Sequence, residues 1–465
     1  MEQANYPKPT LNSHIFRAYD IRGVVPDDLS DEVVWHLGRA FAQQVKGLNK
    51  QQVIVAADGR LSGPHLKDIF IDGLLASGCD VIDIGFVPTP VLYFATEHSP
   101  DQCGVMITGS HNPAQYNGFK MVLDGRSLSE DDIQQLRQLI ERQSYPEGQG
   151  NFQVADACPD YLSRIVSDIK LQRPLKVVID SGNGIAGRIA PTLFEQLGCC
   201  VIPLYCEVDG HFPNHHPDPS KAKNLIDLIH WVKVHQADLG IAFDGDADRM
   251  FIVSNAGQIL YPDRIMRFFA TDLLQRHPNA EILYDVKCSR RLPALIQAQG
   301  GTATLWKTGH SLMKRKLKET GALLAGEMSG HFFFKERWYG FDDGLYSAAR
   351  FIELLAAQPL TCEECFMHFP EDISTPELTI AVSDASKFDL IEQLAMMPFE
   401  RGQVSRIDGL RVDFDEGWGL VRASNTTPTL VLRFEASSFE ALKKIRDDFQ
   451  IRLHQIDKCL TIPQE

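Results

Sequence analysis

Strand-like apolar runs alternate with helix-like runs along most of this chain. Residues 51–57 (QQVIVAA) have the apolar composition of a buried strand, and residues 65–77 have the amphipathic spacing of a helix. Residues 81–86 are strand-like again, and a short apolar run over 104–107 leads into a polar loop. Strands that alternate with helices pair in parallel through crossover connections. The alternation therefore predicts an α/β domain, in which loops at the carboxyl ends of the strands form the usual ligand site.

The same alternation returns in two later parts of the chain. Its strand-like and helix-like runs span residues 175–180, 189–197, 239–243, 282–286, 292–299 and 302–305. The last part differs, because strand-like runs at 378–382, 419–423 and 429–434 precede one helical run at 438–454. A chain of 465 residues is also too long for one ordinary core. We predict three related α/β domains at residues 1–153, 154–256 and 257–367, and a smaller carboxyl-terminal α+β domain at residues 368–465.

The charge and composition of the chain limit the kinds of molecule that it is expected to bind. The net charge of −15 argues against nucleic acid or an anionic membrane as a partner, but it is compatible with a small anionic substrate. The amino-terminal residues lack the basic start and apolar run of a secretory signal, and no apolar stretch is long enough to span a membrane. The ten cysteines are scattered, and the pair Cys362 and Cys365 has no second pair to complete a zinc set. These features predict a cytoplasmic protein with reduced cysteines.

The loop TGSHNP (residues 108–113) carries the first candidate catalytic residue, Ser110. The loop follows a strand-like run, and its glycine and Asn-Pro pair constrain a turn from which a hydroxyl can face a ligand. A serine in a turn is nevertheless more often a local hydrogen-bonding residue than a nucleophile. The sequence has no G-x-S-x-G elbow, which argues against serine-hydrolase chemistry.

The loop DGDADR (residues 244–249) carries a candidate metal site at Asp244, Asp246 and Asp248. In an extended segment alternate side chains point the same way, so we expect the three carboxylates to converge. Adjacent carboxylates repel one another unless a cation lies among them, and oxygen ligands without cysteine or histidine favour Mg²⁺ over Zn²⁺. The alternative is an acidic surface turn. The glycine and the later glutamate are misplaced for an EF-hand.

Two further loops have the composition of ligand-binding turns. In GEMSGH (residues 326–331) the glycines allow close approach of the backbone, and Glu327 and Ser329 offer hydrogen-bonding groups to sugar hydroxyls. In RASNTTPT (residues 422–429) Arg422 stands beside several hydroxyls and one amide, a set that suits the oxygens of a phosphate. A glycine-rich turn and a polar hairpin turn are the alternative interpretations.

Taken in this order, the four loops resemble those of the α-D-phosphohexomutase superfamily, and TGSHNP with GEMSGH is closest to its bacterial phosphomannomutase/phosphoglucomutase members. The resemblance covers essentially the whole chain. It implies four domains around a central cleft, with Ser110 as a phosphoserine whose oxygen joins Asp244, Asp246 and Asp248 in binding Mg²⁺. By position it also implies catalytic roles near the phosphoryl group for Tyr19, Arg22, Lys120 and Arg249. The residues implied to bind substrate are Lys287, His310, Glu327, Ser329, His331, Arg422, Ser424, Asn425 and Thr426.

The resemblance implies an enzyme that interconverts the 1- and 6-phosphates of glucose and mannose. The reaction would proceed through a phosphoserine and a hexose 1,6-bisphosphate that acts as intermediate and activator, in a monomeric protein that supplies precursors of nucleotide sugars. A phosphoglucosamine mutase is the first alternative, although such enzymes usually carry glutamine where this chain has Met328. A Mg²⁺-dependent sugar phosphatase and a sugar-phosphate sensor without catalysis are the others.

Overall fold

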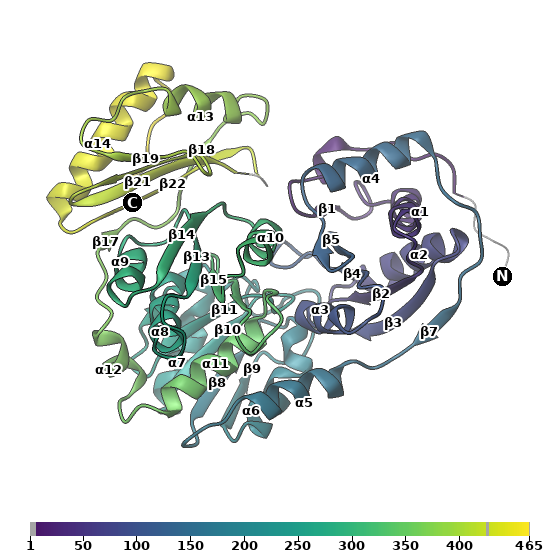
Figure 1. Cartoon of the computed structure of the whole chain (residues 1–465), viewed down its shortest axis with the longest axis horizontal. Coiled ribbons are helices and arrows are strands. Elements are labelled where there is room, and N and C mark those ends of the chain that lie inside the picture. The colour runs from purple at the N-terminus through teal and green to yellow at the C-terminus, as the bar shows by residue number, and fades with distance from the viewer. Residues whose placement is uncertain (1–5, 425–426, 465) are drawn as a thin grey trace. The chain divides into compact units, whose positions relative to one another are not determined.

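The computed structural model of the chain describes residues 6–424 and 427–464. The chain forms two compact units, and helices and strands occur in both (Figure 1). The first unit comprises Met1–Tyr261, His310–Glu319 and Ser329–Phe366. The second unit comprises Pro262–Gly309, Thr320–Met328 and Met367–Glu465. The domain boundaries near residues 153, 256 and 367 stay predictions.

The first sheet of the first unit has the strand order β1-β5-β4-β2-β3-β7, with β6 beside β5. Its strands are β1 (Ile21–Val24), β2 (Gln52–Ala57), β3 (Asp80–Phe86), β4 (Gly104–Ile107), β5 (Tyr116–Leu123), β6 (Arg126–Ser127) and β7 (Phe152–Val154). Strand β2 pairs in parallel with β3 and β4, as predicted. Strand β5 runs antiparallel to β4 and β1, which the sequence analysis did not predict. Its buried Asn117 and Lys120 interrupt the apolar run that is typical of an inner strand.

Four helices accompany this sheet, namely α1 (Asp31–Gly47), α2 (Gly63–Ala76), α3 (Thr89–Glu97) and α4 (Asp131–Arg142). Helix α1 begins where the Ser30 hydroxyl accepts a hydrogen bond from the backbone N–H of Val33. Helices α1 and α2 pack against each other (Figure 1), and a Cβ atom on Gly38 would lie only 2.4 Å from the carbonyl oxygen of Phe70. Glycine therefore allows the two helix backbones to touch.

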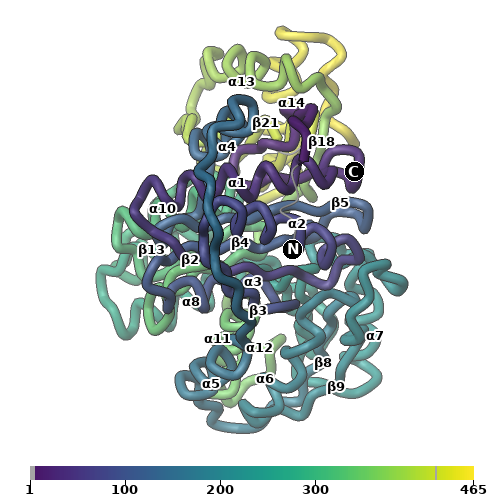
Figure 2. The backbone as a smooth tube through the Cα atoms, turned by 90° about the vertical axis from the view of Figure 1, so that its right-hand side faces the viewer, coloured from purple at the N-terminus to yellow at the C-terminus, as the bar shows by residue number. Residues whose placement is uncertain are grey.

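After α4 the chain returns along one edge of this sheet. Figure 2 shows the extended connection, drawn in blue, that leads from α4 to α5 (Cys158–Asp168). Strand β7 belongs to this connection and pairs in parallel with β3, at the end of the strand order. The connection therefore adds an edge strand before the chain enters the second sheet.

The second sheet of the first unit has the strand order β12-β11-β10-β8-β9. Its strands are β8 (Lys176–Asp180), β9 (Cys200–Leu204), β10 (Leu239–Phe243), β11 (Met250–Ser254) and β12 (Ile259–Leu260), and the remaining helices include α6 (Ala190–Gln196), α7 (Ile226–Val234) and α11 (Gly344–Ala356). Strand β8 pairs in parallel with β9 and β10, as predicted. Strands β10 and β11 form an antiparallel pair, and the acidic loop at residues 244–249 joins them.

The second unit also contains a parallel and an antiparallel sheet region. Strand β13 (Glu281–Asp285) pairs in parallel with β14 (Thr302–Trp306) and β15 (Leu324–Gly326), beside helices α8 (Pro262–Arg276) and α9 (Arg291–Ala298). The antiparallel sheet consists of β17 (Ile373–Ser374), β18 (Leu378–Ala381), β19 (Gln403–Ser405), β20 (Leu410–Phe414), β21 (Gly417–Ala423) and β22 (Thr429–Ala436). Helices α13 (Lys387–Ala395) and α14 (Phe439–Ile456) cover one of its faces (Figure 1). This arrangement confirms the predicted carboxyl-terminal α+β fold.

Two predictions from composition concern cysteines and membranes. Cys362 and Cys365 are buried on the short helix α12 (Cys362–Met367), and no cysteine in the described part of the chain forms a disulfide. Within residues 6–424 and 427–464, every helix is too short or too polar to cross a membrane.

Candidate active site

Ser110 lies in the loop that follows β4, with a backbone φ of 47° and only 1% of its surface exposed. Positive φ is uncommon for a residue other than glycine, and it persists where surrounding contacts hold the backbone. The Ser110 hydroxyl donates a hydrogen bond to Oδ2 of Asp244 at 2.8 Å, and it lies 3.1 Å from Nδ1 of His111. The structure therefore brings the predicted nucleophile to one of the predicted metal ligands.

Asp244, Asp246 and Asp248 are fully buried, and one carboxylate oxygen from each lies within 4.8 Å of the others. This confirms that the three carboxylates converge. The expected reason was wrong, because the segment is not extended. The chain turns between β10 and β11, with Ala247 at a φ of 62°, and the turn aims the side chains inward.

The electrostatics of this cluster favour a cation. Burial, followed by the charges of Asp248 and Asp246, raises the pKa of Asp244 well above its usual range. Burial also opposes ionisation of Asp248, but Lys120 and His331 outweigh it and hold the pKa of that carboxyl well below its usual range. Oδ1 of Asp246 and Oδ1 of Asp248 are buried, and neither accepts a hydrogen bond from a residue that the structure describes. Buried carboxylate oxygens in this state fit a hard divalent cation such as Mg²⁺.

Two cationic side chains reach the same cluster. Arg249 donates from Nη2 to the Ser110 hydroxyl at 3.2 Å and from Nε to Oδ2 of Asp244 at 3.1 Å. Lys120, on β5, donates to Oδ2 of Asp246 at 2.6 Å and to Oδ2 of Asp248 at 2.5 Å. Burial lowers the pKa of Lys120, but the two carboxylates outweigh it and raise that pKa well above its usual range. Both predicted cations are thus within hydrogen-bonding distance of the acidic cluster.

Arg22 contacts the loop that carries Ser110. Arg22 donates from Nη1 to the Asn112 side-chain oxygen at 2.5 Å and from Nε to Oδ2 of Asp20 at 2.6 Å. Tyr19 instead lies against His310, with ring centroids 5.5 Å apart in an edge-on arrangement. The structure therefore places Arg22 at the nucleophile loop and Tyr19 beside a histidine.

The predicted histidines lie at the acidic cluster. Nε2 of His331 is 3.4 Å from Oδ1 of Asp248, and Nδ1 of His331 lies 2.8 Å from the Ser329 hydroxyl. The rings of His310 and His331 stack with their centroids 5.7 Å apart. Burial, together with Lys314 and Lys120, holds the pKa of His310 well below its usual range, so His310 is neutral at pH 7. His310, Ser329 and His331 belong to the first unit, as Ser110 does.

Sequence reasoning missed several residues that support this cluster. Asp342 accepts a hydrogen bond from Nζ of Lys314 at 2.8 Å, and its other oxygen lies 3.7 Å from Nδ1 of His310. The Thr89 hydroxyl donates to Oδ2 of Asp246 at 2.6 Å. Neither Thr89 nor Asp342 belongs to a recognisable motif, so the sequence gives no signal for them.

The remaining predicted residues belong to the second unit. Glu327 is buried and accepts a hydrogen bond from the backbone N–H of Gly309 at 2.8 Å, and Lys287 lies 3.3 Å from Glu377. Arg422, on β21, donates to Oδ2 of Asp408 at 3.0 Å, and the same oxygen accepts the backbone N–H of Thr308 at 3.0 Å.

Ser424 follows the end of β21 at Ala423. The Ser424 hydroxyl accepts a hydrogen bond from the backbone N–H of Thr427 at 3.1 Å. Asn425 and Thr426 lie outside the described residues.

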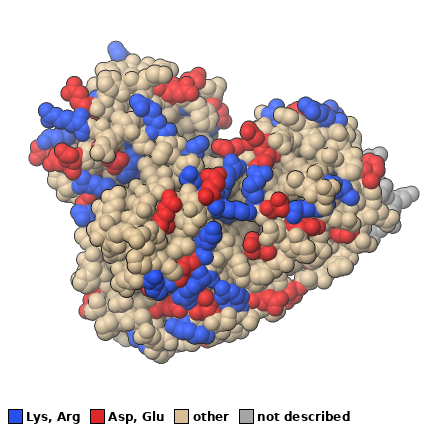
Figure 3. Space-filling view, viewed as in Figure 1, with Lys and Arg blue, Asp and Glu red and all other residues tan. Residues whose placement is uncertain are grey.

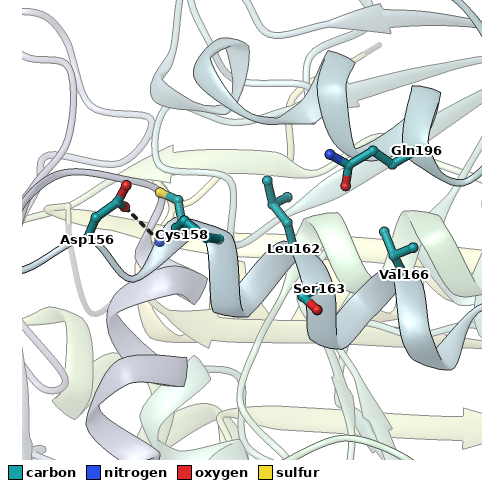
Figure 4. A pocket seen from close by; sticks show the side chains of 7 residues that line it. Asp156, Cys158, Leu162, Ser163, Val166 and Gln196 are labelled. Carbon is teal, nitrogen blue, oxygen red and sulfur yellow. Dashed lines mark hydrogen bonds between the residues drawn. The ribbon is translucent and has the colours of Figure 1, made fainter.

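The first unit also carries a pocket of about 490 Å³ that none of the predicted site residues lines. Its walls come from α5 and the segment before it, with Gln196 of α6 opposite, as Figure 4 shows. Burial raises the pKa of the Cys158 thiol to about 11, so that thiol is protonated and unreactive at neutral pH. The side chains in this pocket do not form a catalytic set.

Models for four domains of one protein family match the chain. They describe phosphoglucomutase/phosphomannomutase alpha/beta/alpha domain I at residues 13–147, domain II at 159–257, domain III at 261–372 and the C-terminal domain at 377–451. Each of the four loops discussed above lies within a different one of these ranges.

Individual relatives resemble the chain over nearly its whole length. A phosphomannomutase/phosphoglucomutase of Pseudomonas aeruginosa is 55% identical over 456 residues, which cover 98% of each chain. A phosphoglucomutase of Neisseria meningitidis is 49% identical over 441 residues, covering 94% of this chain and 96% of its own. The crystal structure of a phosphoglucomutase/phosphomannomutase family protein from Burkholderia thailandensis has a TM-score of 0.94 at 48% identity, over 98% of this chain and 100% of that chain.

Proposed function

The chain belongs to the phosphoglucomutase/phosphomannomutase family, and we therefore propose that it interconverts the 1- and 6-phosphates of glucose and mannose. One observation carries the proposal. The Ser110 hydroxyl is hydrogen-bonded to Asp244 and Arg249, so a single nucleophile lies between an acidic group suited to a metal and a cation suited to a phosphoryl oxygen.

In the proposed cycle Ser110 carries the phosphoryl group. Phospho-Ser110 transfers it to the free hydroxyl of a hexose monophosphate: the serine P–O bond breaks, a new P–O bond to the sugar forms, and the proton of the sugar hydroxyl is passed on to the Ser110 oxygen. The resulting hexose 1,6-bisphosphate reverses its orientation in the site and returns its other phosphoryl group to Ser110. The net reaction moves the phosphate between the two positions and consumes no other reactant.

Charge neutralisation is the main demand of this chemistry, because the phosphoserine oxygens repel an incoming hydroxyl. Asp244, Asp246 and Asp248 are proposed to hold Mg²⁺ together with an oxygen of phospho-Ser110. When bound, the ion would offset negative charge on the transferring group. Arg249 would do the same from the side of Asp244, since its guanidinium already reaches the Ser110 hydroxyl at 3.2 Å.

Proton transfer and sugar binding are assigned to the other residues that the family resemblance places near the reacting group or the sugar. Lys120, Arg22 and Tyr19 are proposed to provide general acid and base groups. Lys287, His310 and His331 are proposed to contact the sugar. The phosphate that does not react is assigned to Arg422 with Ser424, Asn425 and Thr426.

The direct test is a coupled assay on glucose 1-phosphate and mannose 1-phosphate, run beside glucosamine 6-phosphate and a measurement of free phosphate. We expect turnover of both hexose phosphates. Preferred turnover of glucosamine 6-phosphate would identify a phosphoglucosamine mutase instead. Steady release of phosphate in place of isomerised product would indicate a phosphatase, and binding without exchange would indicate a sensor.

The wild type should convert glucose 1-phosphate and mannose 1-phosphate with kcat/KM values within about one decade of each other. The two sugars differ only in the orientation of the hydroxyl at C2, whereas Glu327 and Ser329 are proposed to hold the hydroxyls at C3 and C4. Glu327→Ala should therefore depress both kcat/KM values in parallel. Glu281→Ala is the matched control, because Glu281 accepts a hydrogen bond from Thr304 in the same unit but lies outside the predicted site. An effect of Glu327→Ala on one epimer alone would contradict the dual specificity.

Arg422→Ala should act mainly on KM, because Arg422 is proposed to bind the phosphate that does not react. Loss of one charge-assisted contact costs roughly 1.5–3 kcal/mol, or about one to two decades in kcat/KM. Steady-state kinetics would measure this beside Arg452→Ala, which removes an arginine that donates to Asp448 on α14. An unchanged kcat/KM for Arg422→Ala would remove Arg422 from the site.

We also propose a monomeric, cytoplasmic protein whose ligands are phosphosugars rather than nucleic acid or membrane. The net charge of −15 supports this, since such a surface disfavours polyanions. On the face drawn in Figure 3, basic and acidic side chains are interspersed among uncharged ones. Size-exclusion chromatography with light scattering would test the oligomeric state.

A further inference from the structure

The side chain of Arg60 lies under the loop that carries Ser110. Its Nη1 donates to the carbonyl oxygens of Pro113 and Tyr116, both at 2.7 Å. Its Nη2 donates to the carbonyl oxygens of Ser110 at 2.7 Å and Asn112 at 2.5 Å. One guanidinium thus holds four backbone carbonyls of the seven-residue stretch 110–116.

Arg60 is itself fixed on its other sides. Its Nε lies 3.4 Å from Oδ2 of Asp58, and that oxygen also accepts the Thr108 hydroxyl at 2.6 Å. The Thr108 hydroxyl oxygen in turn accepts the backbone N–H of Ser110 at 2.8 Å. The guanidinium is pressed against the loop backbone, because a Cβ on Gly109 would lie 2.5 Å from its Cζ. Only 2% of the Arg60 surface is exposed.

The conformation of the loop explains what this support does. Ser110 has a φ of 47°, an unfavourable value for serine that persists only when the surroundings impose it. Four carbonyls that converge on one point would also repel one another without a donor between them. A guanidinium supplies fixed, planar donors and keeps its charge, whereas a lysine offers a point charge with three donors. Arginine is therefore the side chain that fits this position.

We propose that Arg60 is a positioning residue for phosphoryl transfer, which holds the Ser110 loop in the geometry that aims the serine oxygen at the acidic cluster. The inference rests on the proposed function of Ser110 as the phosphoryl carrier. Arg60 touches neither the substrate nor the reacting atoms and acts through the loop backbone. Its loss should lower the efficiency of transfer to a bound sugar more than it lowers attack by water, because water needs no fixed orientation of the loop.

The test compares Arg60→Met with Arg350→Met in the full chain. Arg350 is a matched control, since it is also buried, with 1% of its surface exposed, and it pairs with Glu336 away from the Ser110 loop. Arg60→Met should lower kcat about 100-fold with KM within about threefold of wild type, as expected when a reacting group is displaced by about an ångström. The phosphate released per mutase turnover should rise about tenfold, because the rate of transfer to the sugar falls more than the rate of hydrolysis by water. Arg350→Met should lower the melting temperature but leave both kinetic values near those of wild type.

Arg60→Lys keeps a positive charge beside Asp58. This variant is used for the same measurements if Arg60→Met does not fold. It should turn over about tenfold more slowly than wild type, because an ammonium cannot reproduce the four bonds. A kcat for the folded Arg60 variants equal to that of Arg350→Met, or an unchanged ratio of phosphate release to turnover, would overturn the positioning role. Absence of mutase turnover or of phosphorylated Ser110 in the wild type would instead overturn the proposed function, and with it this inference.

Discussion

Ser110→Ala is expected to reduce mutase turnover by several orders of magnitude while the protein remains folded. The hydroxyl is the group proposed to carry the phosphoryl between the two sugar positions, and it donates a hydrogen bond to Oδ2 of Asp244 at 2.8 Å. Intact-mass analysis of the wild type should show a population heavier by one phosphate, which should be absent from the variant.

Ser110→Gly is the companion variant. It also lacks the hydroxyl, but glycine accepts the positive φ of 47° without strain, so it should be at least as stable as Ser110→Ala. Both variants should be equally inactive, which separates loss of the nucleophile from loss of stability. Turnover close to wild type in either of them would end the phosphoserine hypothesis.

Removal of the divalent cation is expected to abolish turnover, and added Mg²⁺ should restore it. Asp246→Asn should lower turnover about 100-fold in saturating Mg²⁺, because one charged oxygen ligand is lost where transition-state charge develops. A metal ion that binds the folded state but not the unfolded state also raises the melting temperature of the protein. Thermal unfolding should therefore show an upward shift on addition of Mg²⁺ to the wild type, and a smaller shift for Asp246→Asn.

Asp343→Asn is the control for the loss of a buried carboxylate. Asp343 caps α11 through the backbone N–H of Tyr346 and accepts a hydrogen bond from the Tyr161 hydroxyl, and burial raises its pKa to about 7. Asparagine can keep both hydrogen bonds, so this variant should retain the Mg²⁺-dependent shift of the wild type. Activity that persists in excess chelator would show that the metal assignment is wrong.

The strands on which the site is built could be predicted from the sequence alone. All four residues of β4 are buried, and all five residues of β10 are buried, so each appears as an uninterrupted apolar run. The signal is local, because a strand covered on both faces needs apolar side chains at successive positions. The polar loops that follow these two strands could also be identified from the sequence. A loop that follows a buried parallel strand already indicates a ligand site.

The strand β5 shows where this local signal fails. Its buried Lys120 would be unfavourable in an ordinary core, and it is stabilised here by carboxylates 126 and 128 residues away along the chain. The turn of the acidic loop, with Ala247 at a φ of 62°, was missed for a related reason. A positive φ at alanine has no sequence signature, because contacts elsewhere in the fold impose it.

The sequence by itself determined the alternation of strands and helices, the four polar loops and the chemistry that their side chains can supply. Only the tertiary structure decided which of those groups meet, as when Ser110 reaches Asp244 across 134 residues of chain. The tertiary structure also decided which side chain supports the Ser110 loop, since Arg60 holds that loop from a position 50 residues before Ser110. The physical reason is that strand pairing brings together loop ends that are distant in sequence, and buried polar groups then select their partners by distance and geometry rather than by order along the chain.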